Sequence, residues 1–118
     1  MIYIVNYGIG NLGSVQNMLK KIGAEVRFAT TAKDIYSAKK LILPGVGAFD
    51  SCMQALQNSG MLAALEEQVV QKKVPLLGIC VGYQMLTHKS EEGKLSGVGW
   101  LDAETIKFSD ESKKMQIP

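Results

Sequence analysis

Short, continuously apolar runs alternate with longer segments of helical spacing over residues 1–86. A continuous apolar run is typical of a strand in a parallel sheet that is covered on both faces, because both sets of its side chains contact apolar neighbours. The chain has three such runs, at residues 2–5, 41–43 and 75–79, and we expect a further strand at 25–29. The alternation therefore predicts an α/β fold in three layers, with helices on both faces of a mostly parallel sheet.

The apolar residues between these runs predict the covering elements. We expect helices from about 11 to 23, from about 49 to 58 and over 62–69, and the first turn of another at 83–86. Thr31, with Asp34 three residues later, has the spacing of a capping box and predicts a short helical turn. The alternating stretch 103–108 predicts hairpin-like strands.

The composition indicates a single compact domain and excludes several classes of function. With 47% hydrophobic and 20% charged side chains, residues 1–118 fit one domain around one core. The net charge of +2 is scattered, so nothing indicates nucleic-acid binding. No apolar run approaches the roughly 18 residues of a membrane-spanning helix, and no basic leader precedes the first strand. We therefore expect a cytoplasmic protein whose two cysteines stay reduced.

Three glycine-rich loops follow predicted strands, at residues 8–10, 44–47 and 78–82. In an open parallel sheet, the loops that follow strands lie at one edge, and ligands bind at that edge. Glycine lets backbone N–H groups approach a ligand closely. We therefore expect the ligand site of the protein at this edge.

Cys80 is the candidate nucleophile. Gly78 and Gly82 stand two positions before and after it, as in the nucleophile elbow, where a strained turn joins a strand to a helix. At a helix N-terminus, unpaired N–H groups favour the thiolate, which is the reactive form. Because cysteines are often buried, the alternative is that Cys80 only packs. Cys52 lies on the apolar face of its predicted helix, and we interpret it as a core residue.

A thiolate that attacks a carbonyl group needs N–H donors for the developing oxyanion, and each donor is worth roughly 100- to 1,000-fold in rate. The elbow offers the N–H of Val81. The second donor could be Val46, in the loop after the third strand. Pro44 should end that strand, and Gly45 and Gly47 would let a peptide turn its N–H inward. An ordinary tight turn is the alternative for this loop.

Residues 8–13 also read G-x-G-x-x-G between a strand and a helix, which is the fingerprint of a dinucleotide-binding domain. That fingerprint needs an Asp or Glu about 20 residues later, at the end of the second strand, to bind the ribose. Residues 28–31 are Phe-Ala-Thr-Thr, so the acid is missing. Arg27 or Lys33 could instead meet a phosphate-bearing cofactor. An NAD(P)-binding domain therefore remains an alternative, although it gives Cys80 no role.

Together these motifs resemble the triad-type glutamine amidotransferases, and within them most closely the glutaminase subunits of imidazole glycerol phosphate synthases. The resemblance rests on Asn-Tyr-Gly-Ile-Gly-Asn-Leu at 6–12 with Ser-Val at 14–15, Leu-Pro-Gly-Val-Gly-Ala-Phe at 43–49 and Gly-Ile-Cys-Val-Gly-Tyr-Gln at 78–84. The first and second motifs are specific to this subunit, whereas the elbow is shared by the wider class. The resemblance implies a flavodoxin-like sheet. It also implies that Gly13 completes the dinucleotide pattern only by coincidence.

The resemblance also implies an activity. This activity is hydrolysis of glutamine to glutamate and ammonia through a thioester on Cys80, without a cofactor or a metal. Gln84 matches the position that holds the substrate, together with Gly45 and Gly47 of a movable oxyanion strand. The N–H groups of Val46 and Val81 would form the oxyanion hole.

A partner is implied as well. The ammonia would pass through a channel into a (β/α)₈ barrel synthase subunit, in a heterodimer that forms imidazole glycerol phosphate in histidine biosynthesis. Asn11 matches a loop close to that partner. The sequence leaves open a paralogous route for the ammonia, such as amidination of a cell-surface sugar.

The chain departs from the family in one respect. The family's catalytic His and Glu lie in a downstream segment, and this chain ends at Pro118, where the family pattern continues. We therefore expect residues 1–118 to be the N-terminal portion of an amidotransferase-like domain, inactive alone. On a continued helix, His88 would lie about 12 Å from Cys80, too far for proton transfer, and we interpret it as a surface residue. A catalytically silent relative that acts as a binding module is the remaining alternative.

Overall fold

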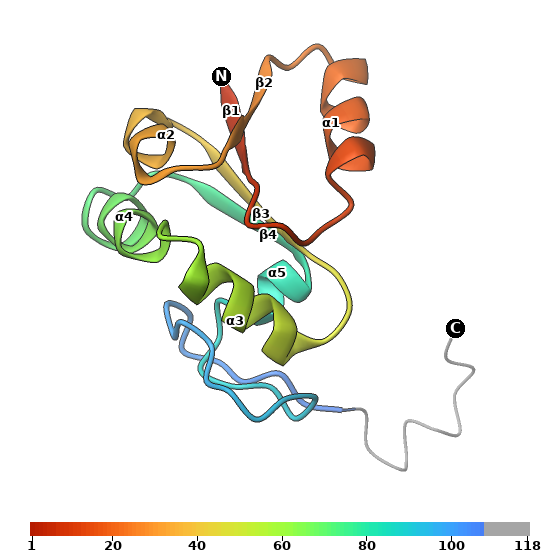
Figure 1. Ribbon diagram of the computed structural model, residues 1–118, viewed down its shortest axis with the longest axis vertical. Coiled ribbons are helices and arrows are strands. Elements are labelled where there is room, and N and C mark those ends of the chain that lie inside the picture. The colour runs from red at the N-terminus through yellow and green to blue at the C-terminus, as the bar shows by residue number, and fades with distance from the viewer. Residues whose placement is uncertain (108–118) are drawn as a thin grey trace.

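The computed structural model describes residues 1–107, and a parallel sheet of four strands forms its centre (Figure 1). The strands are β1 (Ile2–Val5), β2 (Val26–Ala29), β3 (Leu41–Gly45) and β4 (Leu76–Cys80). Their order across the sheet is β2-β1-β3-β4. The register pairs Ile4 with both Phe28 and Ile42, and Gly45 with Cys80. The predicted α/β class and parallel sheet are confirmed.

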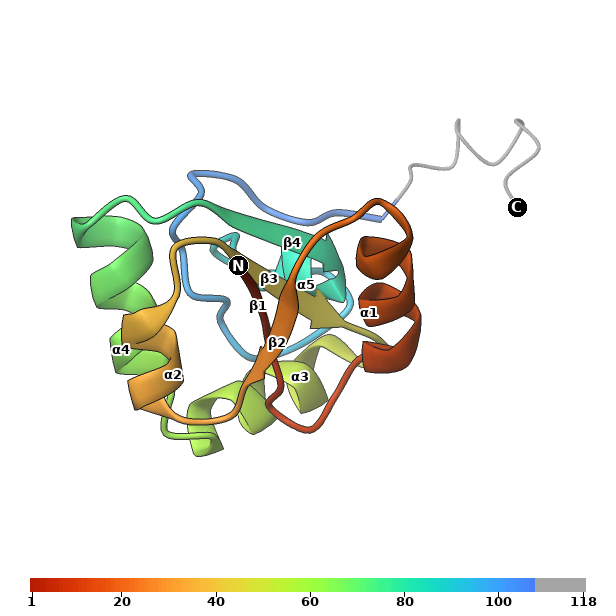
Figure 2. The same ribbon diagram turned by 90° about the horizontal axis from the view of Figure 1, so that it is seen from above.

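Helices cover both faces of this sheet (Figure 2). They are α1 (Leu12–Lys21), α2 (Ala32–Ser37), α3 (Phe49–Asn58), α4 (Leu62–Glu66), the π-helical turn η1 (Glu67–Gln71) and α5 (Val81–Gln84). On one face, α1 places Val15 and Leu19 against Ile4 and Ile42 in a small core. The remaining helices pack over the opposite face, around a larger core that contains Leu43. No helix within residues 1–107 is both long and apolar enough to cross a membrane.

The helix α3 shows how the spacing of apolar residues determines packing. Phe49, Cys52, Met53 and Leu56 recur at helical spacing, and each of these side chains is at most 1% exposed. Residues three and four apart lie on one side of a helix, so all four side chains enter the larger core together. The interpretation of Cys52 as a core residue is confirmed.

β3 continues through Pro44 to Gly45, so the expectation that Pro44 ends the strand is wrong. Alternate residues of a strand turn their N–H and C=O groups to opposite neighbours. The C=O of Lys40 accepts a hydrogen bond from the N–H of Tyr3 in β1, so Pro44, four residues on, also faces β1. The pairing of β3 with β1 ends at Ile42. Pro44 can therefore stay in the strand, because its missing N–H faces β1 and leaves the ladder between β3 and β4 intact.

The helix expected over 62–69 forms, but it widens into a π-helical turn at Glu67. This turn carries Gln68, a polar side chain that is only 4% exposed. Its Nε2 donates to the carbonyl oxygens of Ile35 and Tyr36, near the end of α2. The carbonyl of Ile35 also accepts a hydrogen bond from the N–H of Ala38, so Gln68 adds a second donor there and supplies one to the Tyr36 carbonyl near the helix end.

The predicted hairpin at 103–108 is wrong for the residues that the structure describes, and residue 108 lies outside them. The segment after α5 forms two isolated bridges, one antiparallel and one parallel, in place of strands. It runs back along the end of α5, where the N–H groups of Val98 and Leu101 donate to the carbonyls of Met85 and Leu86. Alternating sequence predicts extended backbone, but it does not identify the backbone with which that segment pairs.

The backbone of the elbow lies directly against β3 and folds closely on itself, and three glycines permit these contacts. A Cβ atom added to Gly82 would overlap the carbonyl oxygen of Leu43. A Cβ on Gly45 would lie 2.5 Å from the backbone nitrogen of Gly82, and one on Gly78 would lie 2.7 Å from the Cα of Tyr83. Real Cβ atoms do not come this close to backbone atoms, so all three positions require glycine.

Thr31 and Asp34 form the predicted capping box at the start of α2. The Oγ1 of Thr31 accepts a hydrogen bond from the N–H of Asp34 at 3.3 Å, and the Asp34 carboxylate accepts from the N–H groups of Thr30 and Thr31. The hydrogen bond from the Thr30 backbone, followed by those from Thr31, holds the pKa of Asp34 below its usual value.

Acid should weaken this cap. A carboxyl group whose pKa is lower in the folded state stabilises the fold above its unfolded pKa, about 3.9 for Asp, and this contribution is lost as the pH falls through the folded value. In thermal unfolding followed by circular dichroism, Asp34→Asn should lower Tm at pH 7 and reduce the fall in Tm between pH 6 and pH 3. An unchanged fall would contradict the assignment of this hydrogen-bonded carboxylate.

The glycines near the sheet edge should differ sharply in their tolerance of a methyl group. Gly82→Ala should destabilise the protein by about 3 kcal/mol or more, because the new Cβ meets the backbone of β3. Gly13→Ala is the matched control, because no atom lies within 4 Å of its Cβ position. It should stabilise α1 by up to about 1 kcal/mol. Urea unfolding of both variants measures the difference, and equal stabilities would contradict the close contact.

Candidate active site

Cys80 is the last residue of β4 and directly precedes α5, as the elbow pattern predicts. Its backbone has φ 55° and ψ −123°, a conformation that residues with a Cβ rarely adopt. Such strain costs about 1–3 kcal/mol and persists only where the surrounding structure imposes it. Here Gly78 and Gly82 pack tightly on either side of the turn. The Cys80 side chain is exposed, so the turn presents the thiol at the surface and does not bury it.

The loop after β3 lies beside this thiol, because Gly45 pairs with Cys80 in the sheet. Neighbouring strands are about 4.8 Å apart. Successive residues of a strand direct their backbone N–H and C=O groups to opposite neighbours. Because those of Pro44 face β1, the C=O of Gly45 faces β4 and the elbow. The N–H and C=O of one trans peptide point in opposite directions, so the N–H of Val46 points away from Cys80.

The Gly45–Val46 peptide must therefore rotate before the Val46 N–H can face a group bound at Cys80. That a peptide of this loop changes orientation stays a prediction. The two glycines of the loop serve different purposes: Gly47 has a positive φ of 86°, and Gly45 is glycine because the elbow leaves no room for a Cβ.

A pocket of about 350 Å³ joins these residues. Its lining comprises Asn11, Val15, Pro44, Gly45, Val46, Gly47, Ile79, Cys80 and Val81. The structure thus brings together the sequence-predicted nucleophile, both predicted oxyanion residues, two of the three predicted glutamine-binding residues and the predicted partner-facing residue. The third glutamine-binding candidate, Gln84, is not in the lining. It is half-buried at the end of α5, and its Oε1 lies 3.5 Å from the Oγ of Ser90.

His88 does not belong to this pocket. The helix α5 ends at Gln84, so His88 is not on a continued helix. Its side chain is half-exposed, and its Nε2 lies 3.0 Å from Oδ1 of Asp102. The interpretation of His88 as a surface residue is confirmed. The lining of the pocket, as described for residues 1–107, contains no histidine or carboxylate that could serve as a general base.

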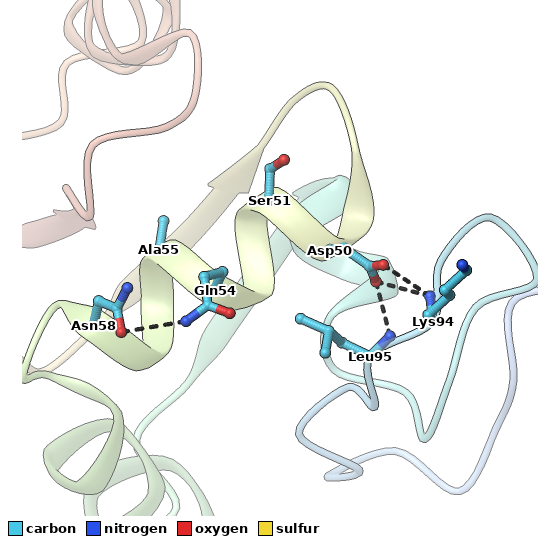
Figure 3. A pocket seen from close by; sticks show the side chains of 7 residues that line it. All are labelled: Asp50, Ser51, Gln54, Ala55, Asn58, Lys94 and Leu95. Carbon is cyan, nitrogen blue, oxygen red and sulfur yellow. Dashed lines mark hydrogen bonds between the residues drawn. The ribbon is translucent and has the colours of Figure 1, made fainter.

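A second, more open hollow lies between α3 and the segment that follows α5 (Figure 3). Asp50 is one of the lining residues, and its carboxylate accepts hydrogen bonds of 2.9 Å from the backbone N–H groups of Lys94 and Leu95. These bonds, led by that from Leu95, lower the pKa of Asp50. Because its carboxylate is already engaged by backbone donors, we interpret Asp50 as the tie that holds this segment on α3.

Sequence reasoning assigned no role to Tyr7, and it treated Cys52 only as core. Tyr7 is 7% exposed, and its hydroxyl donates to the carbonyl oxygen of Pro44. The thiol of Cys52 donates to the carbonyl oxygen of Val46 at 3.4 Å. Both side chains therefore contact the backbone of the loop beside Cys80. The aromatic residue in the first motif was the only sequence signal, and it carries no information about this contact.

The G-x-G-x-x-G pattern occurs in the sequence, but the structure lacks the packing and the acidic residue that a dinucleotide site requires. Its third glycine should allow close packing between helix and strand. At Gly13, no atom lies within 4 Å of the Cβ position. β2 ends at Ala29, which offers no carboxylate to a ribose. For metals, residues 1–107 contain no group of three or more His, Cys, Asp or Glu side chains that could hold an ion.

Comparisons with known proteins agree with the site. Residues 3–116 match the family model of the CobB/CobQ-like glutamine amidotransferase domain. The chain is 50% identical over 108 residues to the imidazole glycerol phosphate synthase subunit HisH 2 of Pseudomonas aeruginosa, which covers 92% of the chain and 54% of that protein. It is 50% identical over 118 residues to HisH 2 of Methanococcus maripaludis, covering 100% and 58%. The chain therefore spans little more than half the length of these relatives.

A solved structure of a glutamine amidotransferase has the same fold. The TM-score is 0.74 at 20% sequence identity, and the match covers 89% of this chain and 55% of the other. At this identity the likeness concerns the fold alone, and the order β2-β1-β3-β4 of this chain is flavodoxin-like. The match to the family model covers almost the whole chain. On these grounds the chain belongs to the glutamine amidotransferase family.

Proposed function

We propose that the protein containing this chain hydrolyses glutamine to glutamate and ammonia, with Cys80 as the nucleophile. The observation that carries the proposal is the strained, exposed Cys80 at the turn between β4 and α5, within a pocket that the Gly45–Val46 peptide also lines. Family membership supports the same chemistry. A thiol presented at an elbow is suited to attack on a carboxamide carbon, which forms a covalent intermediate.

The chemistry divides into two halves. The Cys80 sulfur attacks the carboxamide carbon of glutamine, the C–N bond breaks, and ammonia leaves after it gains a proton. Water then attacks the thioester, and glutamate leaves with regeneration of the thiol. In each half the carbonyl oxygen becomes an oxyanion, for which we assign the N–H groups of Val81 and, after rotation of its peptide, Val46 as donors.

We assign Gly45, Gly47 and Gln84 to substrate binding. Gly45 and Gly47 line the pocket. Gln84 is one turn after Cys80, and its amide could reach the α-amino or carboxylate group of glutamine if it released Ser90. The relatives are nearly twice as long as this chain, and we assign the general base and its orienting carboxylate to the portion of the protein that this chain does not span.

We further propose that the ammonia is used by a synthase subunit. The relatives are named as subunits of imidazole glycerol phosphate synthase, so a (β/α)₈ barrel subunit that forms imidazole glycerol phosphate is the proposed partner. Asn11 lines the Cys80 pocket and is exposed, a position that suits a contact with that subunit. A buried channel between the two subunits would keep the ammonia from water.

The central test compares Cys80→Ser with His88→Ala in the full-length protein bound to its barrel subunit. Cys80→Ser should lower glutamate production by at least about 1,000-fold, because a hydroxyl is a far weaker nucleophile at neutral pH. His88→Ala should retain the activity, because His88 pairs with Asp102 outside the pocket. A coupled glutamate assay measures both. Retained activity in Cys80→Ser, or its loss in His88→Ala, would contradict the assignment.

Residues 1–118 alone should form no measurable glutamate, with or without the barrel subunit. The elbow is a local feature, so Cys80 in this chain should still react with iodoacetamide. A thioester cycle also needs a base, and the loss of one member of such a unit costs on the order of a million-fold. Turnover by the isolated chain that disappears in Cys80→Ser would show that residues 1–118 contain a base.

A further inference from the structure

Two buried side chains hold the backbone on either side of the Gly45–Val46 peptide. Before it, the Pro44–Gly45 peptide is held through the Pro44 carbonyl oxygen, which accepts from the Tyr7 hydroxyl. After it, the Val46–Gly47 peptide is held through the Val46 carbonyl oxygen, which accepts from the Cys52 thiol. Tyr7 is 7% exposed and Cys52 is fully buried, so both donors are fixed in the core.

The anchors come from separate parts of the fold. Tyr7 follows β1, and its hydroxyl also lies 3.5 Å from the sulfur of Met85, just after α5. Cys52 is in the second turn of α3. Burial, and then the nearby Cys52 thiol, raises the pKa of Tyr7 above its usual range, so its hydroxyl stays protonated and can donate.

The Gly45–Val46 peptide lies between them, and neither buried side chain bonds to it. A peptide unit is planar, so it rotates through changes in the two dihedral angles that flank it, here ψ of Gly45 and φ of Val46. If the planes before and after are held, rotation is confined to that single unit. The Val46 side chain, which is 53% exposed, packs too little to oppose the rotation.

We propose that Tyr7 and Cys52 are positioning residues for glutamine hydrolysis: they fix the two flanking peptides so that only the Gly45–Val46 peptide turns, and its N–H then reaches the oxyanion accurately. The proposal rests on the proposed function. An oxyanion donor acts mainly in the transition state, and a misplacement of about 1 Å can cost up to 100-fold in rate. Neither anchor touches the substrate in this role.

The first test measures kinetics of Tyr7→Phe and Cys52→Ala in the full-length protein with its barrel subunit. Each variant should lower kcat for glutamine roughly tenfold and leave KM within about twofold, because the donor is needed in the transition state. Alkylation of Cys80 by iodoacetamide forms no oxyanion, so its rate should stay unchanged. Tyr3→Phe, which removes the same hydroxyl from a half-buried tyrosine of β1, should leave kcat and KM unchanged.

The second test does not depend on activity. The N–H of Gly45 belongs to the peptide held by Tyr7, and the N–H of Gly47 belongs to the peptide held by Cys52. Backbone ¹⁵N relaxation should therefore show a lower order parameter at Gly45 in Tyr7→Phe and at Gly47 in Cys52→Ala.

The outcomes separate this inference from the proposed function. A full-length protein that hydrolyses no glutamine would overturn the proposed function. The relaxation data would still test whether Tyr7 and Cys52 hold the two flanking peptides. Normal kcat in both variants, kcat and alkylation lowered equally, or unchanged order at Gly45 and Gly47 would each overturn the positioning role.

Discussion

The contact between β3 and the elbow is the constraint on which the rest of the site depends. The backbone of Gly82 lies directly against the carbonyl of Leu43, and Gly45 lies against the backbone of Gly82. This approach presses the chain into a turn so tight that Cys80 adopts a positive φ. The strain is maintained by packing on both sides of the turn. The same contact therefore exposes the thiol and places the Gly45–Val46 peptide next to it.

The rotation of that peptide would link the two proposed oxyanion donors. While the Gly45 carbonyl faces the elbow, it occupies the side from which the Val81 N–H would approach a substrate oxygen. A turn of the peptide removes this carbonyl and brings the Val46 N–H to the same side. One local motion would thus replace a carbonyl oxygen, which repels an oxyanion, with an N–H group that can donate a hydrogen bond to it. Anchors in the core would confine the motion to one peptide unit.

The sequence predicted the parts of this fold that depend on local order. Continuous apolar runs located β1, β3 and β4, and the spacing of Phe49, Cys52 and Leu56 located the buried face of α3. The glycines beside Cys80 predicted the elbow. Each of these signals is carried by residues that are close along the chain, where periodicity and steric rules apply directly.

The remainder depends on contacts between distant residues. Pro44 was expected to end β3, but it remains in the strand because its missing N–H faces β1, where pairing has ended, and the ladder to β4 continues. The hydroxyl of Tyr7 and the carbonyl of Pro44 are 37 residues apart, and no local pattern predicts that they meet. The partners of the segment after α5 were likewise unpredictable, because alternation indicates extended backbone without identifying its neighbour.

Covalent labelling of the two cysteines tests whether Cys80 is the nucleophile of a glutamine site. The full-length protein with its barrel subunit would be treated with a chloroketone analogue of glutamine, and the labelled peptides would be identified by mass spectrometry. We expect one adduct, on the exposed Cys80, which excess glutamine prevents, and none on the buried Cys52. An adduct on Cys52, or labelling of Cys80 that glutamine does not slow, would contradict the assignment of Cys80 as the nucleophile of a glutamine site.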